Sequence, residues 1–281
     1  MADDGRRSSR AGRTSAPGAR SHQGNKQAID AVRKRLGAQP VRDQRRGRAA
    51  ERDRGGTHRR AEKAAPKHTP VHLADDIVKE LHSAVRPGKG EILVQVFSEA
   101  VAAFAEEDFE EAIRLGEQAK HLALRSTNAR EFLGLAYYRT GKWREAAREL
   151  SAFRRISGSN DQNPVIADAY RAMKKPDKAL EWVDQVDART SPAEVYYEAA
   201  IVGAGALNDM GHLDAAIERL EQLDLEPRVA QEHHLRAWYV LGDLLEKKGR
   251  FTQARRWFDA IAGVDPEITD APERAARLRR G

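Results

Sequence analysis

Acidic and histidine clusters are the residues in this chain whose types could carry out chemistry. Carboxylates occupy positions 106–108 and 110–111, and paired carboxylates can serve as general acid and base. These acids straddle a predicted corner between two helices, where a solvated acidic surface is the simpler interpretation. His233 and His234 are adjacent on a predicted helix, so their rings point in different directions and do not favour a shared metal ion.

Two glycine-containing segments also fail as sites for phosphate. Gly203 and Gly205 lie inside a predicted helix and lack the third glycine and the preceding strand of a dinucleotide-binding motif. Residues 86–90 form a turn that is too short for a phosphate-binding loop. The chain has no cysteine, which excludes disulfides, thiolate metal ligands and a cysteine nucleophile. We therefore expect no enzymatic activity, no cofactor and no metal site.

The charge of the chain is unevenly distributed. Residues 1–70 carry 19 Lys and Arg against 7 Asp and Glu, whereas the remainder carries 30 against 36. The first part has no aromatic residue and few large apolar ones, so it cannot bury enough surface to offset its ordering entropy. We predict a disordered basic tail over residues 1–70. Its arginines could contact the phosphates of RNA or of a ribosome, or could simply be solvated; the candidate contacts are Arg42, Arg45, Arg46, Arg48, Arg52, Arg54, Arg59 and Arg60.

The sequence shows no sign of membrane insertion or export. It has no run of about 18 apolar residues, and residues 1–7 lack the apolar core of a secretory signal. We expect a cytoplasmic location and no membrane partner. The oligomeric state is left open.

From residue 71 the pattern becomes helical and repetitive. Small residues recur at Ala112, Ala146, Ala179, Ala216 and Ala254, with spacings of 34, 33, 37 and 38 residues. Each is preceded, twelve positions earlier, by another small residue, namely Ala100, Gly134, Ala167, Ala204 and Gly242. Two antiparallel helices can cross closely only where their side chains are small. The pattern therefore predicts five stacked helix pairs.

These residues resemble the tetratricopeptide repeat family, whose unit is a 34-residue helix–turn–helix. The last copy is the most complete, with Trp238, Leu241, Gly242, Leu245, Gly249, Phe251, Ala254, Phe258 and Pro266 at the family's spacing. The third copy departs from the family pattern with Pro176 where an aromatic residue is usual, and the first copy departs from it with Glu99 and Glu107. The whole chain also resembles actinobacterial repeat proteins with basic N-terminal extensions.

The fold expected from this resemblance is an all-α solenoid over residues 71–281. It begins with a helix over residues 71–85, ends with a capping helix over residues 271–280, and has a capping box at residues 191–194 that starts another helix. We number the copies one to five; they span approximately residues 93–126, 127–158, 160–190, 193–226 and 231–266.

The resemblance implies that the first helix of each copy lines a concave groove that binds a peptide or a protein. In the family, groove residues fall one, four and five positions after the small residue of the first helix. They correspond here to Leu135, Tyr138, Arg139, Asp168, Arg171, Asn208, Asp209, Asp243, Glu246 and Lys247, with Tyr239 pointing the same way. We predict a non-enzymatic scaffold or adaptor. The alternatives are a nucleic-acid or ribosome-associated factor that uses its basic tail, and a tail that occupies its own acidic groove.

Overall fold

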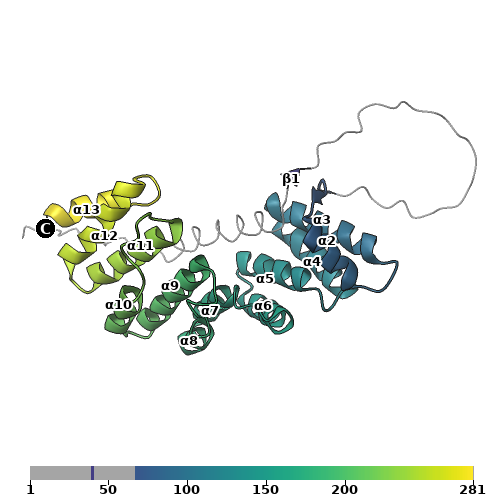
Figure 1. Ribbon diagram of the computed structural model, residues 1–281, viewed down its shortest axis with the longest axis horizontal. Coiled ribbons are helices and arrows are strands. Elements are labelled where there is room, and N and C mark those ends of the chain that lie inside the picture. The colour runs from purple at the N-terminus through teal and green to yellow at the C-terminus, as the bar shows by residue number, and fades with distance from the viewer. Residues whose placement is uncertain (1–38, 41–66, 281) are drawn as a thin grey trace, which may run out of the picture.

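The computed structural model describes residues 39–40 and 67–280, and in this part of the chain almost all regular structure is helical. Figure 1 shows the helices following one another in chain order along a curved array, with the second helices α6, α8 and α10 along its lower edge. The helices are α2 (Asp75–Ser83), α3 (Gly90–Ala105), α4 (Phe109–Leu122), α5 (Thr127–Arg139), α6 (Trp143–Ser157), α7 (Asn163–Ala172), α8 (Pro176–Val183), α9 (Ala193–Asp209), α10 (Leu213–Glu221), α11 (Glu232–Lys247), α12 (Phe251–Val264) and α13 (Ala271–Arg280).

The predicted solenoid is confirmed. Five helix pairs run from α3–α4 to α11–α12, with α2 before them and α13 after them. Within each pair the two helices pack on each other, and each second helix packs on the first helix of the next copy. The last helix, α13, packs on α12 in the same way, so it takes the place of a sixth first helix and covers the open end of the stack.

Two details of the expected helices are wrong. The helix predicted over residues 71–85 starts only at Asp75, because Val71 and His72 form a short strand, β2, that pairs antiparallel with β1 at Gln39 and Pro40. The predicted capping box at residues 191–194 is also absent, since Pro192 is the N-cap of α9 and makes no side-chain cap bond. Proline at that place fixes φ and so starts the helix without a cap.

The small residues predicted at the helix crossings are buried. The sequence predicted that a small side chain of one helix meets a small side chain of the other, and the structure differs from this in one respect. A Cβ added to Gly134 would lie 2.6 Å from Leu150, and one added to Gly242 would lie 2.8 Å from Phe258. Both large residues come four positions after the small residue of the second helix. The small residue of the first helix therefore makes room for a large side chain of its partner helix.

The corners between the helices of each pair need a left-handed residue. Glycine supplies it in copies two, four and five, where Gly141, Gly211 and Gly249 have φ of 73°, 84° and 83°. In copies one and three the same place holds Glu107 and Lys174, with φ of 64° and 60°. These two corners are strained, because a Cβ disfavours this region.

The core is continuous along the array but changes composition at copy three. One apolar cluster runs from Leu73 to Ala169, a second from Ala167 to Ala206, and a third from Tyr197 to Ala275. Copy three has the shortest helices, α7 with 10 residues and α8 with 8. These two short helices lie in the middle of the array (Figure 1).

Candidate binding groove

The first helices line one face of the array, and polar side chains on this face bond from each copy to the next. Each of these links contains the residue that lies four positions after the small residue of a first helix. The links are Tyr138–Asp168, Arg171–Asp209 and Asn208–Lys247, with donor–acceptor distances of 2.5, 2.9 and 2.5 Å. We call these three links the groove ladder. It joins copies two to five along the face where the groove residues were predicted.

In the first link of the ladder, burial decides which group donates the hydrogen bond. Burial, with the negative charge of Asp168, raises the pKa of Tyr138 well above its usual range. The phenol therefore stays protonated and donates to the Asp168 carboxylate. Arg171 also donates to Asp168 at 3.0 Å, so Asp168 and Asp209 share the single positive charge of one guanidinium.

The two glycines of α9 leave space for the side chains of two arginines from neighbouring helices. A Cβ at Gly205 would lie 2.4 Å from the guanidinium carbon of Arg171, and one at Gly203 would lie 2.4 Å from Arg219 Nε. Arg171 reaches α9 from α7, and Arg219 reaches it from α10, where it also pairs with Asp184 at 2.8 Å. The contact of these glycines with the two arginines joins residues that are distant in sequence, and it was not predicted.

The C-terminal end of the groove is occupied by α13. Arg274 pairs with Asp243 at 3.1 Å and with Glu246 at 2.6 Å, and its guanidinium carbon lies 5.4 Å from the centroid of the Tyr239 ring. Arg277 also pairs with Glu246, at 2.5 Å. Three predicted groove residues, Tyr239, Asp243 and Glu246, are thus engaged by the last helix of the chain.

The N-terminal end is covered by residues 67–83. His68 is buried and contacts Glu106 at 2.7 Å near the C-terminal end of α3. Leu73, Ile77 and Leu81 then join the core at 4%, 2% and 0% exposure. α2 packs on α3 and also touches α5, the first helices of copies one and two. This segment therefore covers the face that copy one would otherwise add to the groove.

Glu80 fixes the end of this segment to copy two. Its carboxylate accepts hydrogen bonds from the backbone N–H of Thr127 at 2.7 Å, from Ser126 Oγ at 2.9 Å and from Asn128 Nδ2 at 3.1 Å. These donors lie at the N-terminus of α5, where the helix dipole favours a negative charge. Sequence analysis missed Glu80, because the residues that it joins are far apart along the chain.

The groove is not acidic. Asp243 and Glu246 pair with Arg274 and Arg277, and Asp168 and Asp209 share Arg171. Arg139 and Lys247 add two further positive charges to the same set of residues. The interpretation of an acidic groove that attracts the basic tail therefore loses its electrostatic basis among the described residues. The tail itself, with the eight arginines from Arg42 to Arg60, lies outside them.

Two predicted groove residues remain. Leu135 is only 5% exposed and belongs to the core of copies one to three, so it offers little surface to a ligand. Arg139 ends α5 and is partly buried, with its guanidinium carbon 5.2 Å from the centroid of the Phe109 ring. Burial lowers the pKa of Arg139 below its usual range.

A further link on the same face was not predicted. Arg236 on α11 pairs with Glu198 on α9 at 2.7 Å. Each of these residues lies six positions before the small residue of its helix, so their equivalent positions in the repeat could have indicated the contact.

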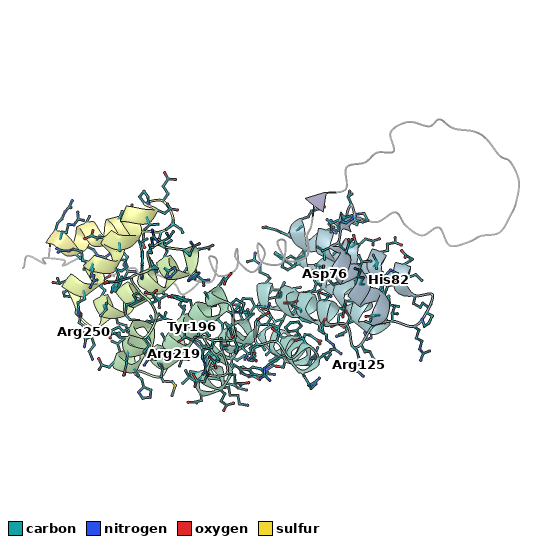
Figure 2. The ribbon with its side chains drawn as sticks, in the orientation of Figure 1. Asp76, His82, Arg125, Tyr196, Arg219 and Arg250 are labelled. Atoms are coloured by element: carbon teal, nitrogen blue, oxygen red, sulfur yellow. The ribbon has the colours of Figure 1, made fainter. Side chains whose placement is uncertain are left out.

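Other features of the described residues are weaker candidates for a functional site. A pocket of about 270 Å³ opens between α8, α9 and α10, and Figure 2 shows Tyr196 and Arg219 of its lining near the middle of the array. Within residues 67–280, no group of three or more His, Asp or Glu side chains is placed to hold a metal ion. None of the described helices combines the length and the apolar character needed to cross a bilayer.

Comparison with known proteins agrees with this architecture. The tetratricopeptide repeat family model matches residues 204–268, which cover most of copies four and five. No curated protein sequence matches the chain.

Solved structures of repeat proteins share the fold at low sequence identity. A thermophilic tetratricopeptide repeat protein from Thermus thermophilus is 18% identical with a TM-score of 0.50, covering 67% of this chain and 100% of that one. The apo form of the quorum sensor NprR from B. thuringiensis is 14% identical with a TM-score of 0.55, covering 72% and 61%. The family model thus assigns residues 204–268 to the tetratricopeptide repeat family. The Thermus thermophilus protein shares the fold over 67% of the chain, and the small residues of the other copies lie in phase with those of the matched part.

Proposed function

We propose that this chain is a non-enzymatic adaptor that binds a segment of another protein in the groove along copies two to five. The observation that carries the proposal is the groove ladder. Its side chains are partly exposed on the face formed by the first helices, and hydrogen bonds between copies hold them in place. Side chains that are ordered before binding lose less conformational entropy when a ligand arrives.

The ends of the chain support a groove of limited length. Residues 67–83 cover copy one, and α13 occupies the acidic residues of copy five. A bound segment would therefore run along α5, α7, α9 and the exposed part of α11. Family members act in general as interaction scaffolds, and this site has donors and acceptors suited to a polypeptide.

The test is affinity capture from a native lysate with three full-length baits. One is the unchanged chain, one carries Arg171→Glu together with Asp209→Lys in the groove, and one carries Glu218→Lys on the exposed side of α10 as a matched control. We expect the same captured proteins with the unchanged chain and the control, and their loss with the groove variant. Equal capture by all three baits would refute the groove as the binding site.

Nuclease treatment separates this proposal from the alternative that rests on the basic tail. Proteins held in the groove should stay bound after nuclease, because no nucleic acid bridges them. If the captured material instead disappears with nuclease and also on removal of residues 1–66, the tail supplies the function through phosphate contacts. Cutting before residue 67 removes β1 but keeps His68 on Glu106 and keeps Leu73, Ile77 and Leu81 in the core.

A further inference from the structure

Among the described residues, Arg139 is the groove arginine that has no ion-pair partner. Its Nε atom is buried without a hydrogen-bond acceptor, and among the described residues no carboxylate lies within ion-pair distance of it. Asp168, Asp209, Asp243 and Glu246 are all paired with arginines. Lys247 also lacks an acidic partner within residues 67–280, but it is exposed and donates to Asn208.

The position of Arg139 is costly for the folded protein. The guanidinium lies against the ring of Phe109 at 5.2 Å, and such a contact offsets only part of the lost hydration. A guanidinium that is partly buried without an ion-pair partner loses hydration that no carboxylate replaces, and this desolvation opposes folding. Burial accordingly lowers the pKa of the guanidinium, and the negative charge of Glu107 only partly opposes this effect.

The place of Arg139 on the groove face suggests which group could pair with its guanidinium. It follows Tyr138, whose hydroxyl begins the groove ladder, and it ends the first helix of copy two. We propose that Arg139 is the anchor for an acidic side chain of the bound polypeptide, which supplies the missing carboxylate when the groove is filled. The inference rests on the proposed function and deepens it by naming the chemistry of the partner.

A single carboxylate fits this site better than a nucleic-acid backbone. Arg139 is the one partly buried cation of the predicted groove set without an ion-pair partner among the described residues. The negative charge of Glu107 lies close enough to act on it, and the neighbouring Tyr138 holds the Asp168 carboxylate. A chain of phosphates would bring further negative charges against these carboxylates. One Asp or Glu side chain neutralises Arg139, and guanidinium and carboxylate groups match each other in shape and hydrogen bonding.

The experiment selects peptides from a randomised display library on the full-length chain and then measures their affinities. The enriched peptide is synthesised with its acidic residue and with the corresponding amide, Glu→Gln or Asp→Asn. Each form is titrated against the unchanged protein, Arg139→Gln, Arg139→Lys and Arg125→Gln. Arg125 is an exposed arginine on the turn between α4 and α5 (Figure 2) and controls for the loss of one positive charge.

We expect Arg139→Gln and the amide peptide each to weaken binding by about 10- to 100-fold, the usual range for a charge-assisted hydrogen bond. Combining the two changes should cost little more than either alone, because both remove the same pair. Arg125→Gln should leave the affinity unchanged, and Arg139→Lys should restore only part of it. The melting temperature of Arg139→Gln should not fall, since the residue has no ion pair to lose and its contact with the Phe109 ring offsets only part of its lost hydration; a purely structural arginine would lower it.

Three results would overturn the inference. Groove peptides that are lost with Arg171→Glu but are indifferent to Arg139→Gln would remove the anchor and leave the proposed function standing. A library that yields no peptide sensitive to Arg171→Glu would remove both. Loss of binding to a polyuridine oligonucleotide with Arg139→Gln, without any effect on peptides, would assign the arginine to phosphate instead.

Discussion

Replacement of Gly134 by alanine tests whether the small residues of the first helices are there for packing. The added Cβ would lie 2.6 Å from both Cγ and Cδ2 of Leu150 and 3.2 Å from its backbone nitrogen. Leu150 is fully buried, so it has no free space into which to move. Overpacking of this kind lowers the free energy of unfolding by about 1–3 kcal/mol. The better helix propensity of alanine raises it by about 1 kcal/mol.

The net expectation is a loss of about 1 kcal/mol in the free energy of unfolding, or about 2–4 °C in melting temperature for a chain of this size. Gly205→Ala is the matched control in another first helix. Its Cβ would meet only the guanidinium of Arg171, whose side chain is 24% exposed and can swing away. The partly exposed ion pairs lost in this way are worth about 0–1 kcal/mol, so the gain in helix propensity should leave the stability unchanged or slightly raised.

Thermal and urea unfolding followed by far-ultraviolet circular dichroism would measure both variants beside the unchanged chain. Because the same substitution is made in two helices, the comparison separates close packing from helix propensity. A Gly134→Ala protein that melts at or above the unchanged chain would refute the packing explanation. So would a Gly205→Ala protein that is the less stable of the two.

Three further predictions concern the corners, the core and the last helix. Lys174→Gly should raise the free energy of unfolding by about 1 kcal/mol, because it relieves a left-handed residue; an unchanged urea midpoint would contradict this. Glu149 is 1% exposed, and burial raises its pKa, but bonds from Arg130 and Lys120 outweigh burial and hold it below the usual range. Glu149→Gln should therefore cost about 3 kcal/mol near neutral pH, and this difference should shrink as the pH falls below about 4.3, as urea unfolding across pH would show. Arg274→Met should loosen α13, which hydrogen exchange would detect as faster exchange in residues 271–280; unchanged exchange there would show that packing on α12 alone holds the helix.

The architecture could be predicted because it repeats. Small residues in phase, such as Ala100 with Ala112 or Gly242 with Ala254, mark close helix crossings in every copy, and five copies average out the local exceptions. Even Pro176 in copy three is compatible with the repeat, since proline is tolerated in the first turn of α8. The strand at Val71 was missed because its partner at Pro40 lies in a part of the chain with no periodic pattern.

The partners of the predicted groove residues could not be read from the sequence. Tyr138 and Asp168 were each placed on the groove face, but their hydrogen bond spans 30 positions and depends on how α5 and α7 are set against each other. The repeat pattern also predicted a capping role for α13 without showing that Arg274 would reach back 31 positions to Asp243. Pairings of this kind depend on the curvature of the array, which no single copy encodes.

The groove ladder connects ligand binding to the shape of the array. Tyr138, Arg171 and Asn208 face the groove, and the same side chains join each copy to the next. A bound segment that takes over the hydroxyl of Tyr138 or a carboxylate from Arg171 must release a link between copies. Copy three, which has the shortest helices, is held on both sides by these links. Because a ligand can change a conformation only through its different affinity for the two states, a segment that replaces these bonds favours a different curvature from one that leaves them intact. If the proposed groove binds a polypeptide, we expect the ladder to discriminate between partners by the hydrogen bonds that they exchange, in addition to the charge that they bring to Arg139.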